Sequence, residues 1–197
     1  MQKSISVYYQ NEPKEMKEPK IKRANNNRSK GKTYAALMHN YKVAIENGYY
    51  GEAELIAYAF IEDRLRSFLY YSGMLDTYNS VHINDCGIII YGKDECVKNI
   101  SAKINVIKKA FNSCGNSSLK NDFTKELRRN YRASLNIPEF RKKLNEIDKW
   151  CEYRNEIVHG MFNKDLEALR SGYQSHVEEG YKLGRYIDQQ VQHLKEV

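Results

Sequence analysis

The sequence predicts an all-α protein, a bundle of five or six helices with little sheet. From residue 33 onward, apolar side chains recur three and four positions apart over most of the chain, which is typical of amphipathic helices. Glycine or proline stands at several of the places where one such stretch gives way to the next. Strand-like character is limited to one short stretch, residues 86–91. These observations favour one helical domain.

Residues 1–32 are predicted to form a flexible basic arm. Lys, Glu, Asn and Pro dominate this stretch, which offers almost nothing apolar to bury. Its last residues run into a Gly-Lys-Thr sequence at 31–33, which resembles the end of a phosphate-binding loop. However, Asn26 stands where that loop needs glycine, and no apolar strand precedes it. We therefore interpret this sequence as a linker entering a helix, and residues 33–197 as the folded domain.

The first half of the domain contains two clear helical patterns. The first runs from residue 33 to Gly48, and the second from Gly51 to about residue 72. The second is apolar around more than one stripe, as expected of a central, buried helix. Four charged residues nonetheless lie in its middle: Glu62, Asp63, Arg64 and Arg66. Residues 74–93 are predicted to be a loop with a short extended segment at 86–91.

The second half contains a helical pattern at residues 95–111, a short basic helix at 122–134, a long helix from Pro138, and a last helix from 164 to about 195. Gly160 is a predicted helix end, and Asn163 a predicted cap. The long helix carries an apolar seam with alternating three- and four-residue spacing. Its members are Ile137, Phe140, Leu144, Ile147, Cys151, Val158 and Met161, with Arg154 at the position after Cys151.

Composition limits the class of protein. The net charge of +7 and pI near 9.1 favour polyanionic partners such as nucleic acid. The four cysteines include no Cys-x-x-Cys pair and have no histidine at zinc-finger spacing, so we expect neither a structural zinc nor another metal or cofactor. They could form two disulfides, but without a signal segment we expect free thiols. No signal segment and no apolar run of about 20 residues is evident, so we expect a cytoplasmic protein that does not enter membranes.

Arg154 is the least expected residue of the apolar seam. An unpaired guanidinium buried there would cost several kcal/mol, so another group must offset it. We expect a salt bridge to Glu62 or Asp63 of the central helix, or stacking on Trp150 one turn back. An ion pair of this kind can be purely structural.

The residues that follow Arg154 suggest chemistry. Asn155 and His159 are four residues apart and share a helix face, and His159 falls in the last turn, where the helix dipole favours imidazolium. A histidine can transfer protons near neutral pH, and the fixed charge of Arg154 can stabilise a phosphorane-like transition state. Arginine and histidine without metal ligands suit phosphodiester chemistry.

The pattern Arg-Asn-x-x-x-His at the end of a long helix resembles the HEPN superfamily of helical ribonucleases and nucleotide-binding domains. The resemblance covers residues 33–195 as architecture and residues 154–159 as motif. An acidic residue of an earlier core helix recurs near the motif in that family, and Glu62 or Asp63 would fill its place. A second pair, Arg170 and His176, also fits the Arg-to-His spacing but lacks the asparagine and the helix end.

The resemblance implies a metal-independent endoribonuclease that leaves a 2′,3′-cyclic phosphate. His159 would act as general base or acid, Arg154 would stabilise the charge on the phosphoryl oxygens, and Asn155 would orient either the histidine or the phosphate. Glu62 or Asp63 would hold the arginine. The implied context is a toxin or an anti-phage defence effector, with an antitoxin or a nucleotidyltransferase as a candidate partner. The alternative is a non-catalytic HEPN-like module that binds RNA, a nucleotide or a partner protein.

Two further expectations concern RNA and assembly. Arg128, Arg129 and Arg132 lie on one short basic helix, which either contacts RNA phosphates or is a solvated basic face. Arg154 and His159 point about 140° apart on a regular helix and differ by about 7.5 Å in height. One copy therefore cannot easily place both groups on one phosphate, and we expect a homodimer with a shared site near Val158 and Met161.

Overall fold

The computed structural model describes residues 27–72, 75–77, 80–81, 99–114, 136–160 and 166–195. Its contacts divide the chain into two units, residues 1–35 and 36–197. The described residues form five helices and one antiparallel pair of short strands. In chain order these are α1 (Asn27–Glu46), α2 (Tyr50–Tyr71), β1 (Leu75–Thr77), β2 (Ser80–Val81), α3 (Ile100–Cys114), α5 (Ile137–Gly160) and α6 (Leu166–Lys195). The prediction of an all-α protein is confirmed for this part of the chain.

The predicted helix bounds agree with the structure for α2, α5 and α6 to within two residues. The predicted start of α1 at residue 33 was wrong, because this helix begins at Asn27 and residues 27–32 are helical rather than part of a flexible arm. The β1–β2 hairpin falls where a loop was predicted, since pairs this short leave almost no periodic signal. The predicted extended segment 86–91 and basic helix 122–134 lie outside the described residues.

Two helix ends follow directly from local sequence. Gly48 has a positive φ of 73°, and its N–H donates to the Ile45 carbonyl oxygen over 3.1 Å. A residue with a side chain would be strained in that conformation, which explains the glycine. At the start of α5, Asn136 Oδ1 accepts a bond from the Glu139 N–H (3.3 Å), so the cap lies two residues before Pro138.

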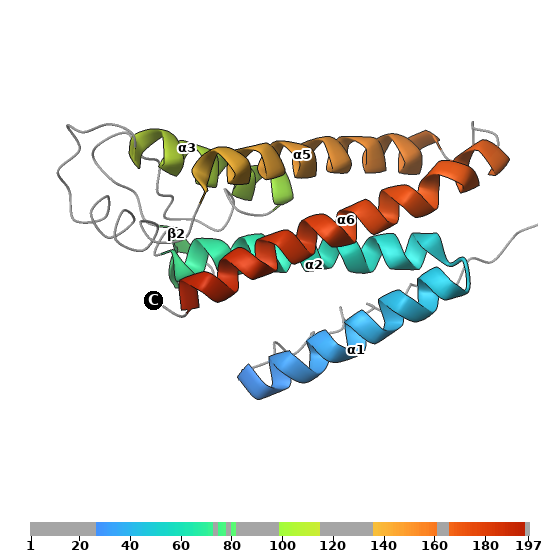
Figure 1. Cartoon of the computed structure of the whole chain (residues 1–197), viewed down its shortest axis with the longest axis horizontal. Coiled ribbons are helices and arrows are strands. Elements are labelled where there is room, and N and C mark those ends of the chain that lie inside the picture. The colour runs from blue at the N-terminus through green and yellow to red at the C-terminus, as the bar shows by residue number, and fades with distance from the viewer. Residues whose placement is uncertain are drawn as a thin grey trace, which may run out of the picture. The chain divides into compact units, whose positions relative to one another are not determined.

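Helices α2 and α6 form the centre of the core. Figure 1 shows them side by side, with α3 and α5 along one side of the pair. At one end, the rings of Phe68 from α2, Phe111 from α3 and Phe140 from α5 pack together with centroid distances of 4.7 to 6.5 Å. Tyr186 of α6 packs on Phe140 at 6.0 Å. Each buried ring contributes about 1.5–3 kcal/mol, so this aromatic cluster ties four helices together.

The charged middle of α2 is neutralised by neighbouring helices. Lys103 of α3 is fully buried, and its Nζ lies 2.8 Å from Glu62 Oε1. Arg64 pairs with Asp63 and, at 3.0 Å, with Asp188 of α6. Because Glu62, Asp63 and Arg64 are paired, α2 can be buried on most sides despite the charges in its middle.

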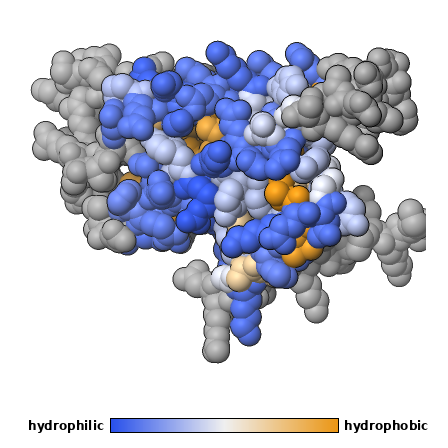
Figure 2. Space-filling view, turned by 45° about the vertical axis from the view of Figure 1, so that its right-hand side comes forward, coloured by the Kyte–Doolittle hydropathy of each residue, from blue (hydrophilic) through white to orange (hydrophobic). Residues whose placement is uncertain are grey.

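Glycines of α6 allow two large rings to approach its backbone. A Cβ at Gly180 would overlap the Trp150 ring of α5, and one at Gly184 would lie 2.5 Å from Phe60 Cδ1 of α2. The remaining helix faces are largely polar, and Figure 2 shows a mainly hydrophilic surface with small, separate apolar areas among the described residues. Gly180 and Gly184 therefore allow α6 to pack closely against α5 and α2.

Replacing Gly180 with alanine is expected to lower the free energy of unfolding by about 1–3 kcal/mol, because the methyl group would displace the Trp150 ring. Gly172, on the same helix, is the matched control, since a Cβ there meets nothing within 4 Å. Gly172→Ala should raise stability by about 0.5–1 kcal/mol through helix propensity. Urea denaturation of both variants measures the difference, and equal gains would refute the close approach.

Candidate functional site

Arg154 belongs to α5, and its side chain lies against α2 with a partly exposed guanidinium. Its Nε is 3.9 Å from Glu54 Oε2, and its Cζ stands 4.9 Å from the centroid of the Tyr58 ring. Nη1 donates to Asn155 Oδ1 over 3.3 Å, and the side chain is 22% exposed. The inner side of the guanidinium is thus held by an acid and a ring, while its outer side reaches solvent.

The acid that faces Arg154 is Glu54, not Glu62 or Asp63 as expected. Glu62 accepts from Lys103, and Asp63 pairs with Arg64. Glu54 and Glu62 are eight residues apart, so they share a face of α2 but differ by two helical turns. The sequence indicates that face, but it does not specify which turn lies opposite Arg154. The ring that contacts the guanidinium likewise belongs to Tyr58 rather than to Trp150.

Glu54 is shared by three side chains, and these four residues are termed the Glu54 cluster: Glu54, Arg154, Tyr173 and His176. The carboxylate is only 3% exposed. Its Oε2 accepts a 2.8 Å bond from the Tyr173 hydroxyl, and its Oε1 lies 3.3 Å from His176 Nε2. Glu54 Oε1, Arg154 Nε and His176 Nε2 are enclosed, and none makes a hydrogen bond of good geometry. The carboxylate therefore pairs Arg154 only loosely.

His176 is the buried histidine of this region. Its ring stacks on Trp150 at 5.0 Å and 13°, and the Tyr153 ring stands edge-on to it at 4.9 Å. Trp150 Nε1 also donates to the His176 carbonyl oxygen over 2.8 Å. Sequence reasoning set His176 aside together with Arg170, whose side chain lies outside the described residues. The sequence feature that could have indicated His176 is Glu54, because an acid among the apolar residues of α2 needs a polar partner.

His159 and Asn155 occupy exposed positions near the end of α5. Arg154 donates a hydrogen bond to Asn155. Among the described residues, no hydrogen bond or ion pair joins Arg154 to His159. The apolar seam also departs from its predicted course, because Ile157 is buried (2% exposed) and Val158 is 41% exposed. Met161, Arg128, Arg129 and Arg132 lie outside the described residues.

Burial keeps the phenols and the thiol of this region neutral. It raises the pKa of Tyr173, which the hydrogen bond to Glu54 raises further. Burial also raises the pKa of Tyr58. The pKa of the free thiol of Cys151 rises to about 12, first through burial and then through the nearby Asp148 carboxylate. None of the three is suited to act as an anionic nucleophile at neutral pH.

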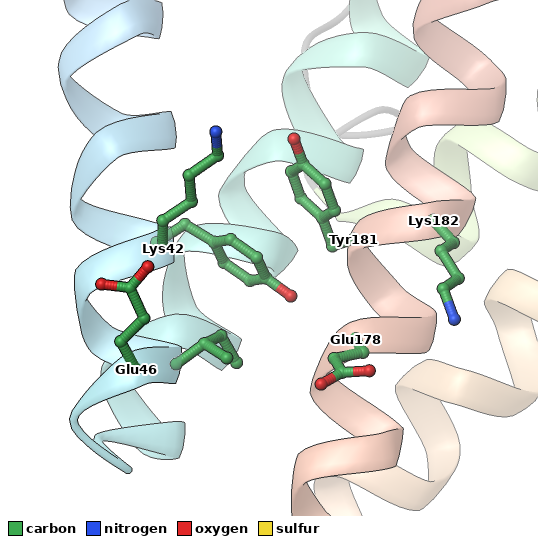
Figure 3. Close-up of a pocket in the computed structure, with 7 residues that line it drawn as sticks. Lys42, Glu46, Glu178, Tyr181 and Lys182 are labelled. Carbon is green, nitrogen blue, oxygen red and sulfur yellow. The ribbon is translucent and has the colours of Figure 1, made fainter.

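The described part of the chain has two notable hollows. One, of about 250 Å³, lies between α1 and α6. Figure 3 shows Lys42 and Glu46 on α1 and Glu178 on α6 beside it, with Lys182 pointing away from α1. Both signs of charge occur at this hollow, which favours no particular ligand. The other, of about 360 Å³, lies between α5 and α6 and has Trp150 and His176 in its lining.

The described residues offer neither a metal site nor a membrane-spanning helix. Among the described residues, no group of three or more His, Cys, Asp or Glu side chains is placed to hold a metal ion. None of the described helices combines the length and apolar character that a membrane span requires. Comparison with known proteins gave no matching protein-family model, no matching curated protein and no matching solved structure.

Replacing Glu54 with alanine is expected to lower the free energy of unfolding by about 2–4 kcal/mol, because Tyr173 and Arg154 would lose the carboxylate that they face. Glu54→Gln retains an acceptor and should cost less than the alanine variant. The exposed Glu156 of α5 is the control, and its alanine variant should remain within about 0.5 kcal/mol of the parent. Urea denaturation tests the ranking, and a Glu54→Ala variant as stable as the control would contradict it.

Proposed function

We propose that this chain is a metal-independent endoribonuclease of the HEPN type, in which Arg154, Asn155 and His159 carry the chemistry. One observation carries the proposal. The guanidinium of Arg154 is positioned by Glu54 and Tyr58, remains incompletely paired, and lies on the same helix as an exposed His159. This combination supplies a fixed positive charge and a proton-transfer group close to solvent.

The pairing of Arg154 argues for more than a structural role. Charge-assisted arginine–carboxylate pairs commonly have two hydrogen bonds of about 2.7–2.9 Å. Here the separation is 3.9 Å, and Nε makes no hydrogen bond. Glu54 is also engaged by Tyr173, so its charge is divided. The guanidinium therefore keeps donors and net charge for an incoming phosphate.

The proposed reaction is transesterification within the RNA strand. The 2′-oxygen of one nucleotide attacks the adjacent phosphorus, and His159 accepts the proton of that hydroxyl. Arg154 stabilises the charge on the phosphoryl oxygens, while Asn155 holds the guanidinium or the phosphate. The bond from phosphorus to the 5′-oxygen breaks, and a second imidazolium protonates that oxygen. The products are a 2′,3′-cyclic phosphate and a 5′-hydroxyl.

A homodimer supplies the second histidine. Arg154 faces α2 whereas His159 is exposed, and on a regular helix their side chains point about 140° apart. Two copies of α5 meeting near a two-fold axis would bring both pairs to one groove. The exposed Val158, one residue before His159, would supply apolar contact there.

The proposed biological setting is growth arrest by RNA cleavage, as a toxin or an anti-phage effector. An antitoxin or a nucleotidyltransferase would then be the natural partner. The competing proposal is a non-catalytic HEPN-like module that binds RNA, a nucleotide or a partner protein. The contact between Arg154 and Glu54 supports that alternative, because an arginine that is paired inside the protein can have a purely structural role.

Purified protein should cleave RNA in the presence of EDTA, and His159→Ala should reduce the rate at least about 100-fold, as loss of a general acid–base commonly does. His193 is the matched control, because it is also an exposed histidine in the last turn of a helix. His193→Ala should cleave at the parental rate. Arg154→Lys should be slow as well, because lysine lacks the planar fork.

Product analysis for the 2′,3′-cyclic phosphate completes that test. Cleavage that survives both His159→Ala and Arg154→Lys would place the activity elsewhere or in a contaminant. RNA binding without cleavage by the parent protein would support the non-catalytic module instead.

The parent protein should be a dimer in light scattering across a range of concentrations, and Val158→Glu should shift it toward the monomer of 23.1 kDa. A charge placed in an apolar contact is desolvated without a partner, which weakens association. Val43 of α1, which has nearly the same exposure, is the control and should leave the dimer intact when changed to Glu. A persistent monomer that still cleaves RNA would refute the shared site.

A further inference from the structure

The hollow between α5 and α6 has the size of a small-molecule site. Its volume of about 360 Å³ falls within the range of roughly 300–1,000 Å³ that is usual for ligand pockets. Its lining combines aromatic side chains with carboxylates, which is a typical composition for recognising a planar, polar ring. The catalytic groups proposed above do not include this lining.

An aromatic wall forms one part of the hollow, made of Trp150, Tyr153 and His176. Trp150 and His176 stack on each other, and the Tyr153 ring stands at 64° to the imidazole. Trp150 and His176 are buried, whereas Tyr153 is 45% exposed and can offer a ring face. Nucleobases stack on side chains of these types.

Carboxylates supply the polar part of the lining. Glu179 of α6 and Glu146 of α5 both border the hollow, and one oxygen of Glu146, Oε2, accepts a hydrogen bond from Lys143 Nζ over 2.7 Å. Ionised carboxylates only accept hydrogen bonds, so they recognise donors such as the exocyclic amino group of cytosine. Uracil presents a carbonyl oxygen at the same position and would face these carboxylates unfavourably. Lys149 also lines the hollow and offers a charge for a phosphate.

Gly172 of α6 also lines the hollow. A Cβ added at this position meets no atom within 4 Å. At its inner end, His176 Nε2 lies 3.3 Å from Glu54, which in turn faces Arg154. A ring stacked on Tyr153 would therefore lie close to the cluster that positions the proposed catalytic arginine, because the Tyr153 ring contacts His176 at 4.9 Å.

We propose that this hollow binds a nucleobase that carries an exocyclic amino group, with cytosine as the simplest case, and that it selects against uracil. Its role as a base-specificity site in RNA cleavage rests on the proposed function. The binding itself does not, and free nucleotides can test it directly.

Trp150 is the only tryptophan of the chain, so its fluorescence reports on the hollow without any label. Cytidine 5′-monophosphate should quench it saturably and bind about tenfold more tightly than uridine 5′-monophosphate, which has a carbonyl oxygen in place of the amino group and a proton on N3. Free N-acetyltryptophanamide corrects for absorption by the nucleotides. Linear quenching without saturation, or equal affinity for the two nucleotides, would overturn the proposal.

Two variants localise the binding. Gly172→Leu should abolish saturable quenching because the side chain fills the hollow, while Gly172→Ala should retain it; circular dichroism verifies that both are folded. Glu146→Met with Glu179→Met should reduce the preference for cytidine to nearly none. Retained binding in Gly172→Leu would place the nucleotide elsewhere and refute the site. Cytidine binding by a protein that cuts no RNA would refute the proposed function but not this inference.

Discussion

The buried carboxylate of Glu54 is the interaction on which this end of the protein depends. Removing an ionised carboxylate from water costs several kcal/mol unless charged or polar groups surround it. Here α5 contributes Arg154, and α6 contributes Tyr173 and His176. These contacts fix α5 and α6 against α2 at a definite height along its axis. The position of the proposed catalytic arginine is therefore a consequence of how one acid is accommodated.

The two ends of the helical core serve different purposes. At one end, the cluster of Phe68, Phe111 and Phe140 supplies apolar burial, and paired charges on α2, α3 and α6 neutralise the middle of α2. At the other end, Glu54 and its partners include enclosed polar atoms without good hydrogen bonds. Such atoms lower stability, and an all-apolar packing would avoid that cost. Stability comes from the first end, which allows the second to remain polar.

The sequence alone predicts the bounds of most of the described helices, but it does not predict which residues meet at the site. Helix bounds follow from short-range signals such as Gly48 and Gly160, which act within one turn. That Arg154 needs an acid of α2 also follows from its place on an apolar seam. The identity of that acid does not, because Glu54 and Glu62 share one helix face and only tertiary packing selects between them. His176 was missed for the same reason: its neighbours Trp150 and Glu54 are distant in sequence.

The sharing of Glu54 also bears on how Arg154 could meet a phosphate. A substrate phosphate would compete with the carboxylate for the guanidinium, and in a simple ion pair this would leave a buried charge alone. Glu54, however, also accepts a hydrogen bond from the Tyr173 hydroxyl over 2.8 Å and lies 3.3 Å from His176, and both groups would stay beside the carboxylate if Arg154 turned outward. Tyr173 and His176 thus lower the free energy needed to move Arg154 from Glu54 to a phosphate. In a single salt bridge no such groups would remain beside the carboxylate.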